Sequence, residues 1–120
     1  MKRKNIRSLL MLAGLIVIPT VVMATTFPKS GKIDRILTDS SSFGKCMIRI
    51  PFDAINGCNG SWISLDCEGK YLDKGDGDRM LNVALIAQNM GKEVSVKIDS
   101  SKKFRGFCVA TRLDILTPAE

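Results

Sequence analysis

The chain has 120 residues, with 18 Lys and Arg against 12 Asp and Glu, four Cys and no His, which is enough for a single domain. Without histidine it cannot assemble a Ser-His-Asp triad, a Cys-His pair or a zinc site that uses histidine, so the commonest hydrolytic sites are excluded. We therefore expect a protein that is not an enzyme and that carries no cofactor.

The first 24 residues have the three parts of a Sec-type signal peptide. Four basic residues lie within positions 2–7, an apolar run covers 9–18, Pro19 interrupts it, and Val22-Met23-Ala24 offers small residues at a cleavage point. The apolar stretch is shorter than the roughly 20 residues of a spanning helix, which favours cleavage over a retained anchor. After cleavage 14 basic groups face 12 acidic ones, so the net charge falls from +6 to +2. The sequence thus predicts export to the periplasm or beyond, with no stable membrane span in the mature chain.

Four cysteines follow in the mature chain, at Cys46, Cys58, Cys67 and Cys108. An even number in a small exported domain is typical of disulfides. Their spacing contains none of the two-residue knuckles of a four-thiolate zinc site, so no metal is expected. Three pairings are open.

The mature chain predicts strands, then one helix, then strands, within a single domain at residues 32–117. Residues 25–31 are expected to be a loose N-terminal lead-in. Alternating apolar residues predict strands at 32–38, 44–50 and 61–68, separated by a serine-rich turn and by the Asn- and Gly-rich segment 56–60. In the third strand Trp62 faces away from Ile63, Leu65 and Cys67.

Apolar residues at helical spacing predict one helix after a polar, glycine-rich loop; they are Met80, Val83, Ala84, Ala87 and Met90. Asp76 or Asp78 is expected to accept hydrogen bonds from the first turn, and Gly91 to end the helix in a left-handed conformation. Asp73, Asp76 and Asp78 together fit the calcium-loop pattern poorly, so helix capping is favoured over a metal site.

Two further strands are predicted at 93–99 and 104–116, joined by a turn at 100–103, with Gly106 as a bend or bulge. Three strands, a helix and two strands is the order of the OB-fold, a five-stranded Greek-key barrel. The expected class is therefore α+β, mostly β, with the helix between the third and fourth strands. In such a barrel Cys67 can pair with Cys108 and Cys46 with Cys58, while the pairing of Cys58 with Cys67 and Cys46 with Cys108 stays open.

Part of the chain resembles the B subunits of AB5 toxins of the subtilase-cytotoxin and pertussis-like types, and small secreted bacterial proteins related to them. The likeness rests on the paired cysteines, on the helix and strand MLNVALIAQNMGKEVSVKID at 80–99, and on Gly106-Phe107-Cys108. In outline it covers roughly residues 31–116. The resemblance implies a homo-oligomeric ring of five that binds glycans of host glycoconjugates, beside a separate A subunit. No sugar-contacting residue of that family is matched to a position here.

A sugar site needs an aromatic face and short polar groups, which makes Asn56, Asn59, Ser61 and Trp62 the candidate contact residues. The structural alternative is that Trp62 covers one end of the core and that the loop is only a turn. A basic C-terminal half is either a surface for an anion or a solvated face; its residues are Lys97, Lys102, Lys103, Arg105 and Arg112.

Two other kinds of partner are compatible with the predicted barrel. OB-folds hold single-stranded nucleic acid in a basic groove with stacked aromatic rings, but export and a mature charge of +2 argue against it. A monomeric periplasmic binding or inhibitor domain that acts on a protein partner is the alternative to glycan binding. The sequence does not separate these two functions.

Overall fold

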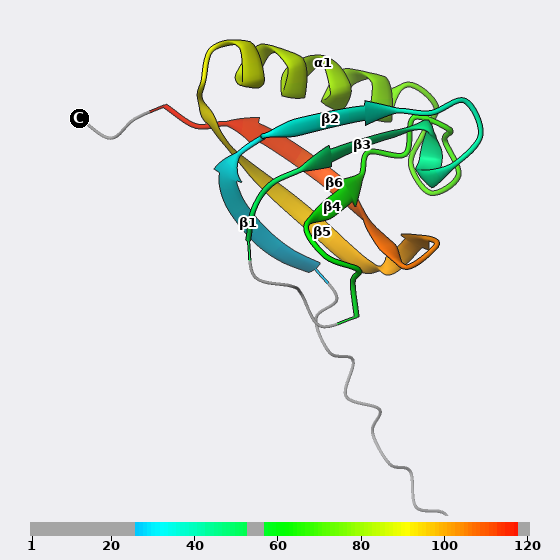
Figure 1. Ribbon diagram of the computed structural model, residues 1–120. Helices are drawn as coiled ribbons and strands as arrows, with labels where there is room; N and C mark the ends of the chain where they lie inside the picture. The colour runs from blue at the N-terminus through cyan, green and yellow to red at the C-terminus, as the bar shows by residue number, and fades with distance from the viewer. Residues whose placement is uncertain (1–25, 53–56, 118–120) are drawn as a thin grey trace, which may run out of the picture.

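The computed structural model describes residues 26–52 and 57–117. These residues form a mostly β structure of the α+β class, with six strands and one α-helix (Figure 1). Two disulfides cross-link it. The predicted signal peptide, residues 1–24, lies outside the described residues. None of the helical segments in these two ranges is long and apolar enough to cross a membrane.

The elements are β1 (Thr26–Lys32), β2 (Arg35–Thr38), a 3-10 turn (Phe43–Lys45), β3 (Cys46–Arg49), β4 (Trp62–Ser64), α1 (Asp76–Asn89), β5 (Glu93–Phe104) and β6 (Phe107–Ile115). The six strands form one sheet in the order β1-β5-β6-β4-β3-β2. Only β4 and β6 run parallel; every other neighbouring pair is antiparallel. The helix packs along β6, β5 and β3, on one side of the sheet (Figure 1).

The N-terminal prediction is wrong, because the expected lead-in is a strand. β1 pairs with β5 along its whole length, from Thr26 opposite Asp99 to Lys32 opposite Glu93. The predicted strand at 32–38 is instead the end of β1, a bend, and the short β2. The sequence does not predict β1 because the segment contains Pro28, and within sheets proline is confined mainly to edge strands. β1 is such an edge strand.

The second and third predicted strands are confirmed in shorter form, as β3 and β4. β4 ends at Ser64 because the chain turns at Asp66, which is buried and has a positive φ of 54°. Its carboxylate accepts hydrogen bonds from backbone N–H groups of the following loop, as described below. The apolar pattern predicts a longer strand. Because the buried Asp66 side chain binds the backbone of the following loop, β4 ends before it.

The predicted helix is confirmed, and Gly91 ends it with a φ of 65°. The predicted caps are wrong. The N-cap residue is Gly75, without a side-chain hydrogen bond, so Asp76 and Asp78 lie within the first turn. There Asp76 forms an ion pair with Arg79, at 2.6 Å between Oδ1 and Nη1. Both carboxylates still lie near the positive end of the helix dipole, where a negative charge stabilises the helix.

The last two strands are confirmed, but the turn between them is not where the sequence predicts it. Residues 100–103 stay within β5, and the chain reverses at Arg105 and Gly106, both with positive φ (52° and 86°). Two successive residues with positive φ form a tight hairpin turn, and the twist of such a turn matches the twist of the antiparallel strands that it joins. The register between β5 and β6 shifts earlier, at Lys97 to Ile98 and again between Asp99 and Lys103. Gly106 is therefore a turn residue and not a bulge.

All four cysteines form disulfides, as predicted, but neither predicted pairing is right. Cys46 is bonded to Cys67, and Cys58 to Cys108. Because β4 ends at Ser64, Cys67 does not lie on the strand beside β6 and cannot face Cys108 across the sheet. It lies in the following loop, near the start of β3.

The main core lies between the inner face of the sheet and the helix. The most enclosed side chains come from alternate positions of β3, β4, β5 and β6, as period-2 patterns require, and from Ala84 and Ala87 of α1. Met47 is equally enclosed, with 2% of its surface exposed, but it belongs to the opposite face of the sheet. That outer face therefore carries a second apolar group.

Candidate functional site

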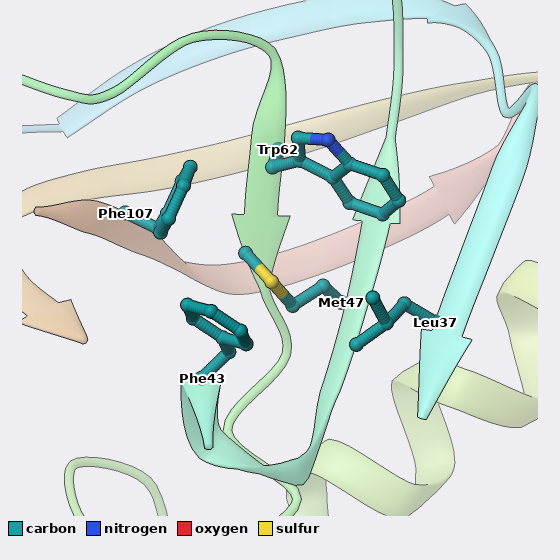
Figure 2. Close-up of a pocket in the computed structure, with 5 residues that line it drawn as sticks. All are labelled: Leu37, Phe43, Met47, Trp62 and Phe107. Carbon is teal, nitrogen blue, oxygen red and sulfur yellow. The ribbon is translucent and has the colours of Figure 1, made fainter. Parts of the chain in front are cut away.

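The outer face of the sheet contains a hollow of about 180 Å³. Figure 2 shows Met47 in the middle of its lining, with Trp62 and Leu37 to one side and two phenylalanine rings to the other. All five lining side chains are apolar; they are Leu37, Phe43, Met47, Trp62 and Phe107. An outward-facing apolar hollow of this kind is a candidate binding site.

Strand register places three of the lining residues on neighbouring strands. Leu37 of β2 lies opposite Met47 of β3, and Trp62 of β4 lies opposite Arg49, two residues further along β3. Because alternate residues of a strand share a face, Leu37, Met47 and Trp62 all point outward. The outer face of β2, β3 and β4 therefore forms the floor of the hollow.

Two turns complete the hollow at one end. Phe43 belongs to the 3-10 turn before β3, and Phe107 is the first residue of β6 after the hairpin turn. Their rings meet edge to face, with centroids 5.5 Å apart and planes at 83°. This geometry is favourable for two aromatic rings. The contact between the two rings joins two segments that lie more than sixty residues apart in the sequence.

Guanidinium groups stand over two of the lining rings. The guanidinium carbon of Arg35 lies 5.8 Å from the centroid of the Trp62 ring, and that of Arg105 lies 5.6 Å from Phe43. Neither arginine forms an ion pair within the described ranges, whereas nearby Arg49 pairs with Asp34 at 3.3 Å. The rim of the hollow is therefore positively charged and rich in N–H donors.

Ser64 carries the polar side chain that lies closest in register to the floor, and its hydroxyl already makes hydrogen bonds within the protein. Ser64, opposite Met47, is fully buried. Its hydroxyl donates to the carbonyl of Phe43 at 2.8 Å and accepts from the N–H of Asp66 at 3.1 Å. The floor thus has no free side-chain hydroxyl, and the available donors lie at the rim.

Of the four contact residues that the sequence suggests, the structure places only Trp62 at the hollow. The Asn59 side-chain amide donates to the carbonyl of Arg105 at 3.1 Å, and the Ser61 hydroxyl donates to that of Phe52 at 3.2 Å. Both bonds anchor the loop before β4. Asn56 lies outside the described residues.

Sequence reasoning missed the other lining residues, namely Leu37, Phe43, Met47 and Phe107. One signal was present: Met47 and Trp62 are apolar residues on the sides of their strands that the alternation assigns to solvent. Phe43 and Phe107 gave no such signal, because only the folded turns bring them together.

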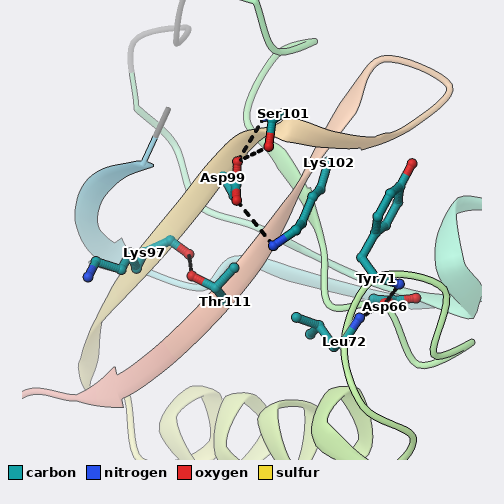
Figure 3. Close-up of polar contacts among 8 residues, drawn as sticks. All are labelled: Asp66, Tyr71, Leu72, Lys97, Asp99, Ser101, Lys102 and Thr111. Atoms are coloured by element: carbon teal, nitrogen blue, oxygen red, sulfur yellow. Dashed lines mark hydrogen bonds and ion pairs between the residues drawn. The ribbon is translucent and has the colours of Figure 1, made fainter. Parts of the chain in front are cut away.

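Beside the hollow, Asp66 organises the loop that follows β4. The carboxylate is buried, and it accepts four backbone hydrogen bonds (two of them marked in Figure 3). Oδ1 accepts from the N–H groups of Gly69 and Lys70, at 3.0 and 2.9 Å. Oδ2 accepts from those of Tyr71 and Leu72, at 2.7 and 2.8 Å. Four donors compensate the burial of one negative charge.

Part of the basic C-terminal half is engaged within the protein. Lys102 forms an ion pair with Asp99, at 3.3 Å between Nζ and Oδ2 (Figure 3). Burial alone would raise the pKa of Asp99, but hydrogen bonds from the Ser101 hydroxyl and N–H, together with Lys102, outweigh it. The pKa therefore lies below its ordinary value of 3.8.

This lowered pKa predicts acid-sensitive stability. A lowered pKa stabilises the fold above the unfolded value, and the stabilisation disappears as the pH falls through the folded value. Asp99→Asn should therefore lower the free energy of unfolding by about 1 kcal/mol near neutral pH, and by less at about pH 3. Urea unfolding at both pH values measures the difference. The same loss at both would contradict the assignment.

Within the described residues, no group of His, Cys, Asp and Glu side chains is placed to hold a metal ion. No protein-family model matches the chain, and no curated protein or solved structure matches it significantly. The resemblance to AB5-toxin B subunits therefore stays a prediction, and the site is interpreted from its own geometry.

Proposed function

We propose that the chain is an exported, non-catalytic binding protein with an OB-like barrel, whose outer hollow binds a glycan. The strand order supports the barrel. β1 and β2 are consecutive in the chain, separated only by residues 33 and 34, yet they occupy the two ends of the sheet order. Counted as one bent strand, they reduce six strands to five, with the helix between the third and the fourth.

The position of the hollow is the observation that carries the function. In that count β3 and β4 are the second and third strands, and their outer face forms the floor. Phe43 comes from the loop between strands one and two, and Phe107 follows the loop between strands four and five. OB-folds bind oligosaccharides and oligonucleotides with this face and these two loops.

The chemistry of the hollow favours a sugar over a nucleic acid in this proposal. The Trp62 ring offers an apolar face for a sugar ring, and the rim arginines offer hydrogen-bond donors for its oxygens. Expected export and a mature charge of only +2 argue against nucleic acid. The resemblance to AB5-toxin B subunits adds the expectation of glycan binding.

A second candidate function rests on the wholly apolar lining of the hollow. Interfaces between proteins are commonly anchored by one large apolar side chain in such a pocket. A monomeric periplasmic binding or inhibitor domain could hold a protein partner in this way. Binding of a protein partner without any glycan would favour this second function.

Replacing Trp62 tests the proposed site. Trp62→Ala should weaken glycan binding at least ten-fold, because stacking is lost, whereas Trp62→Phe should retain part of the affinity because a ring remains. A glycan array identifies ligands, and calorimetry measures each variant. Circular dichroism must show that both variants fold. If Trp62→Ala unfolds the protein, or if both variants bind as the wild type does, Trp62 has only a structural role.

The resemblance also implies a ring of five subunits and a separate A subunit. Light scattering after size exclusion, over a range of concentrations, should give the mass of about five chains. A clean monomer would contradict the ring and favour the second candidate function.

A further inference from the structure

The size and lining of the hollow limit what it can enclose. At about 180 Å³ it is smaller than the roughly 300–1,000 Å³ of pockets that enclose a whole small-molecule ligand. It can therefore take one substituent of a sugar, while the ring itself lies against Trp62 at the opening. All five lining side chains are apolar.

The polar atoms around the floor are oriented or bonded away from an occupant. The Ser64 hydroxyl is bonded to the Phe43 carbonyl and the Asp66 N–H. Figure 2 shows the indole nitrogen of Trp62 on the edge of the ring away from Met47 and Leu37. A sugar hydroxyl turned toward this floor would find no free side-chain hydrogen-bond partner in it. A methyl group would instead gain from burial.

The rim supplies what the floor lacks. Arg35 and Arg105 stand over the rings of Trp62 and Phe43, and neither guanidinium is held by a carboxylate within the described part of the chain. An acetamido group combines a methyl with a carbonyl oxygen beside it. Its methyl fits the apolar floor, and its carbonyl can accept a hydrogen bond from a rim guanidinium.

We infer that the hollow recognises the acetamido group of N-acetylated sugars, with the methyl against Met47 and the carbonyl facing Arg35 or Arg105. This inference rests on the proposed glycan site and adds the class of sugar. It also gives each part of the site a separate role: the floor excludes hydroxyl groups, and the rim fixes the orientation of the amide.

Matched methyl glycosides test the inference on the oxidised protein. The probes are the β-glycosides of N-acetylglucosamine, glucose and glucosamine, with a 6-deoxy sugar as a methyl group without a carbonyl. Trp62 is the only tryptophan of the chain, so its emission reports binding next to the hollow. We expect the N-acetylated glycoside to bind at least ten-fold more tightly than each of the other three.

A pair of arginine variants separates the carbonyl contact from general charge. Arg35→Met keeps an apolar chain over Trp62 but removes the N–H donors, and it should reduce the preference for the acetamido sugar several-fold, with any remainder assigned to Arg105. Arg79→Met, in the first turn of α1, removes the same charge elsewhere and should change nothing.

Each contrary result has its own meaning. Equal binding of glucose, or tighter binding of the 6-deoxy sugar, would overturn the acetamido inference and leave the glycan function standing. Binding of none of these sugars, together with a glycan array without hits, would overturn both. An unchanged preference in the double variant Arg35→Met, Arg105→Met would remove the role of the rim.

Discussion

Replacing Cys58 and Cys108 together with alanine is expected to destabilise the protein more than the same change at Cys46 and Cys67. The two disulfides close segments of 50 and 21 residues. In the chain-entropy model these cross-links contribute about 4 and about 3 kcal/mol, because a longer loop restricts the unfolded chain more. Since small domains are stable by only about 5–15 kcal/mol, reduction of both should leave little folded protein at 37 °C.

Thermal unfolding of the two double variants, measured side by side without reductant, checks this order. Peptide mapping of the unreduced protein checks the pairing itself. A larger loss on removal of the Cys46–Cys67 bond would mean that local packing around it outweighs loop length. An unchanged melting temperature after full reduction would contradict a stabilising role for either disulfide.

Asp66→Asn is expected to lower the free energy of unfolding by about 3 kcal/mol, because buried backbone donors lose their acceptor. The amide keeps the shape of the side chain and tolerates its positive φ, but one oxygen is replaced by an NH₂ group. That group faces backbone N–H donors, including those of Tyr71 and Leu72, which then lose their acceptor. Urea unfolding measures the loss.

Glu68→Gln is the matched control for Asp66→Asn. It makes the same change of acid to amide two residues away, on an exposed side chain. The control should unfold within about 0.5 kcal/mol of the wild type. Similar small losses in both variants would show that the four hydrogen bonds to Asp66 contribute little.

Local patterns in the sequence predict those elements whose packing is regular. Apolar residues at helical spacing place α1, and strict alternation places β3 and β5. β1 is missed because it contains Pro28, and its identity depends on β5, nearly seventy residues away. The turn at Arg105 and Gly106 is missed because the polar residues 100–103 before it have the composition of a turn, although they lie within β5.

The disulfide pairing shows how one local error spreads. If the third strand is extended to Cys67, that residue lies beside β6, and a disulfide between Cys67 and Cys108 is then expected. The chain turns at the buried Asp66, so the strand ends at Ser64, four residues before the predicted end at residue 68, and the hydrogen bonds of Asp66 to the following loop are not visible in the sequence. Pairing therefore depends on a polar contact that periodicity cannot detect.

The candidate site is only partly visible in the sequence. Trp62 is predicted correctly to lie on the outer side of its strand, and it lines the hollow. Asn59 and Ser61 are polar residues near it in sequence, yet each is bonded to backbone of another loop segment. Proximity in sequence selects neighbours of Trp62, whereas the hollow is built from residues that are near only in the fold.

The proposed function requires that the ligand binds in the outer hollow, against Trp62. Titration of the oxidised protein with an N-acetylated glycoside, following tryptophan emission and calorimetry on the same samples, tests it most directly, because Trp62 is the only tryptophan. We expect a saturable change in emission with the same Kd as the calorimetric one. Heat of binding without any change in emission would contradict it, because the ligand would then bind elsewhere.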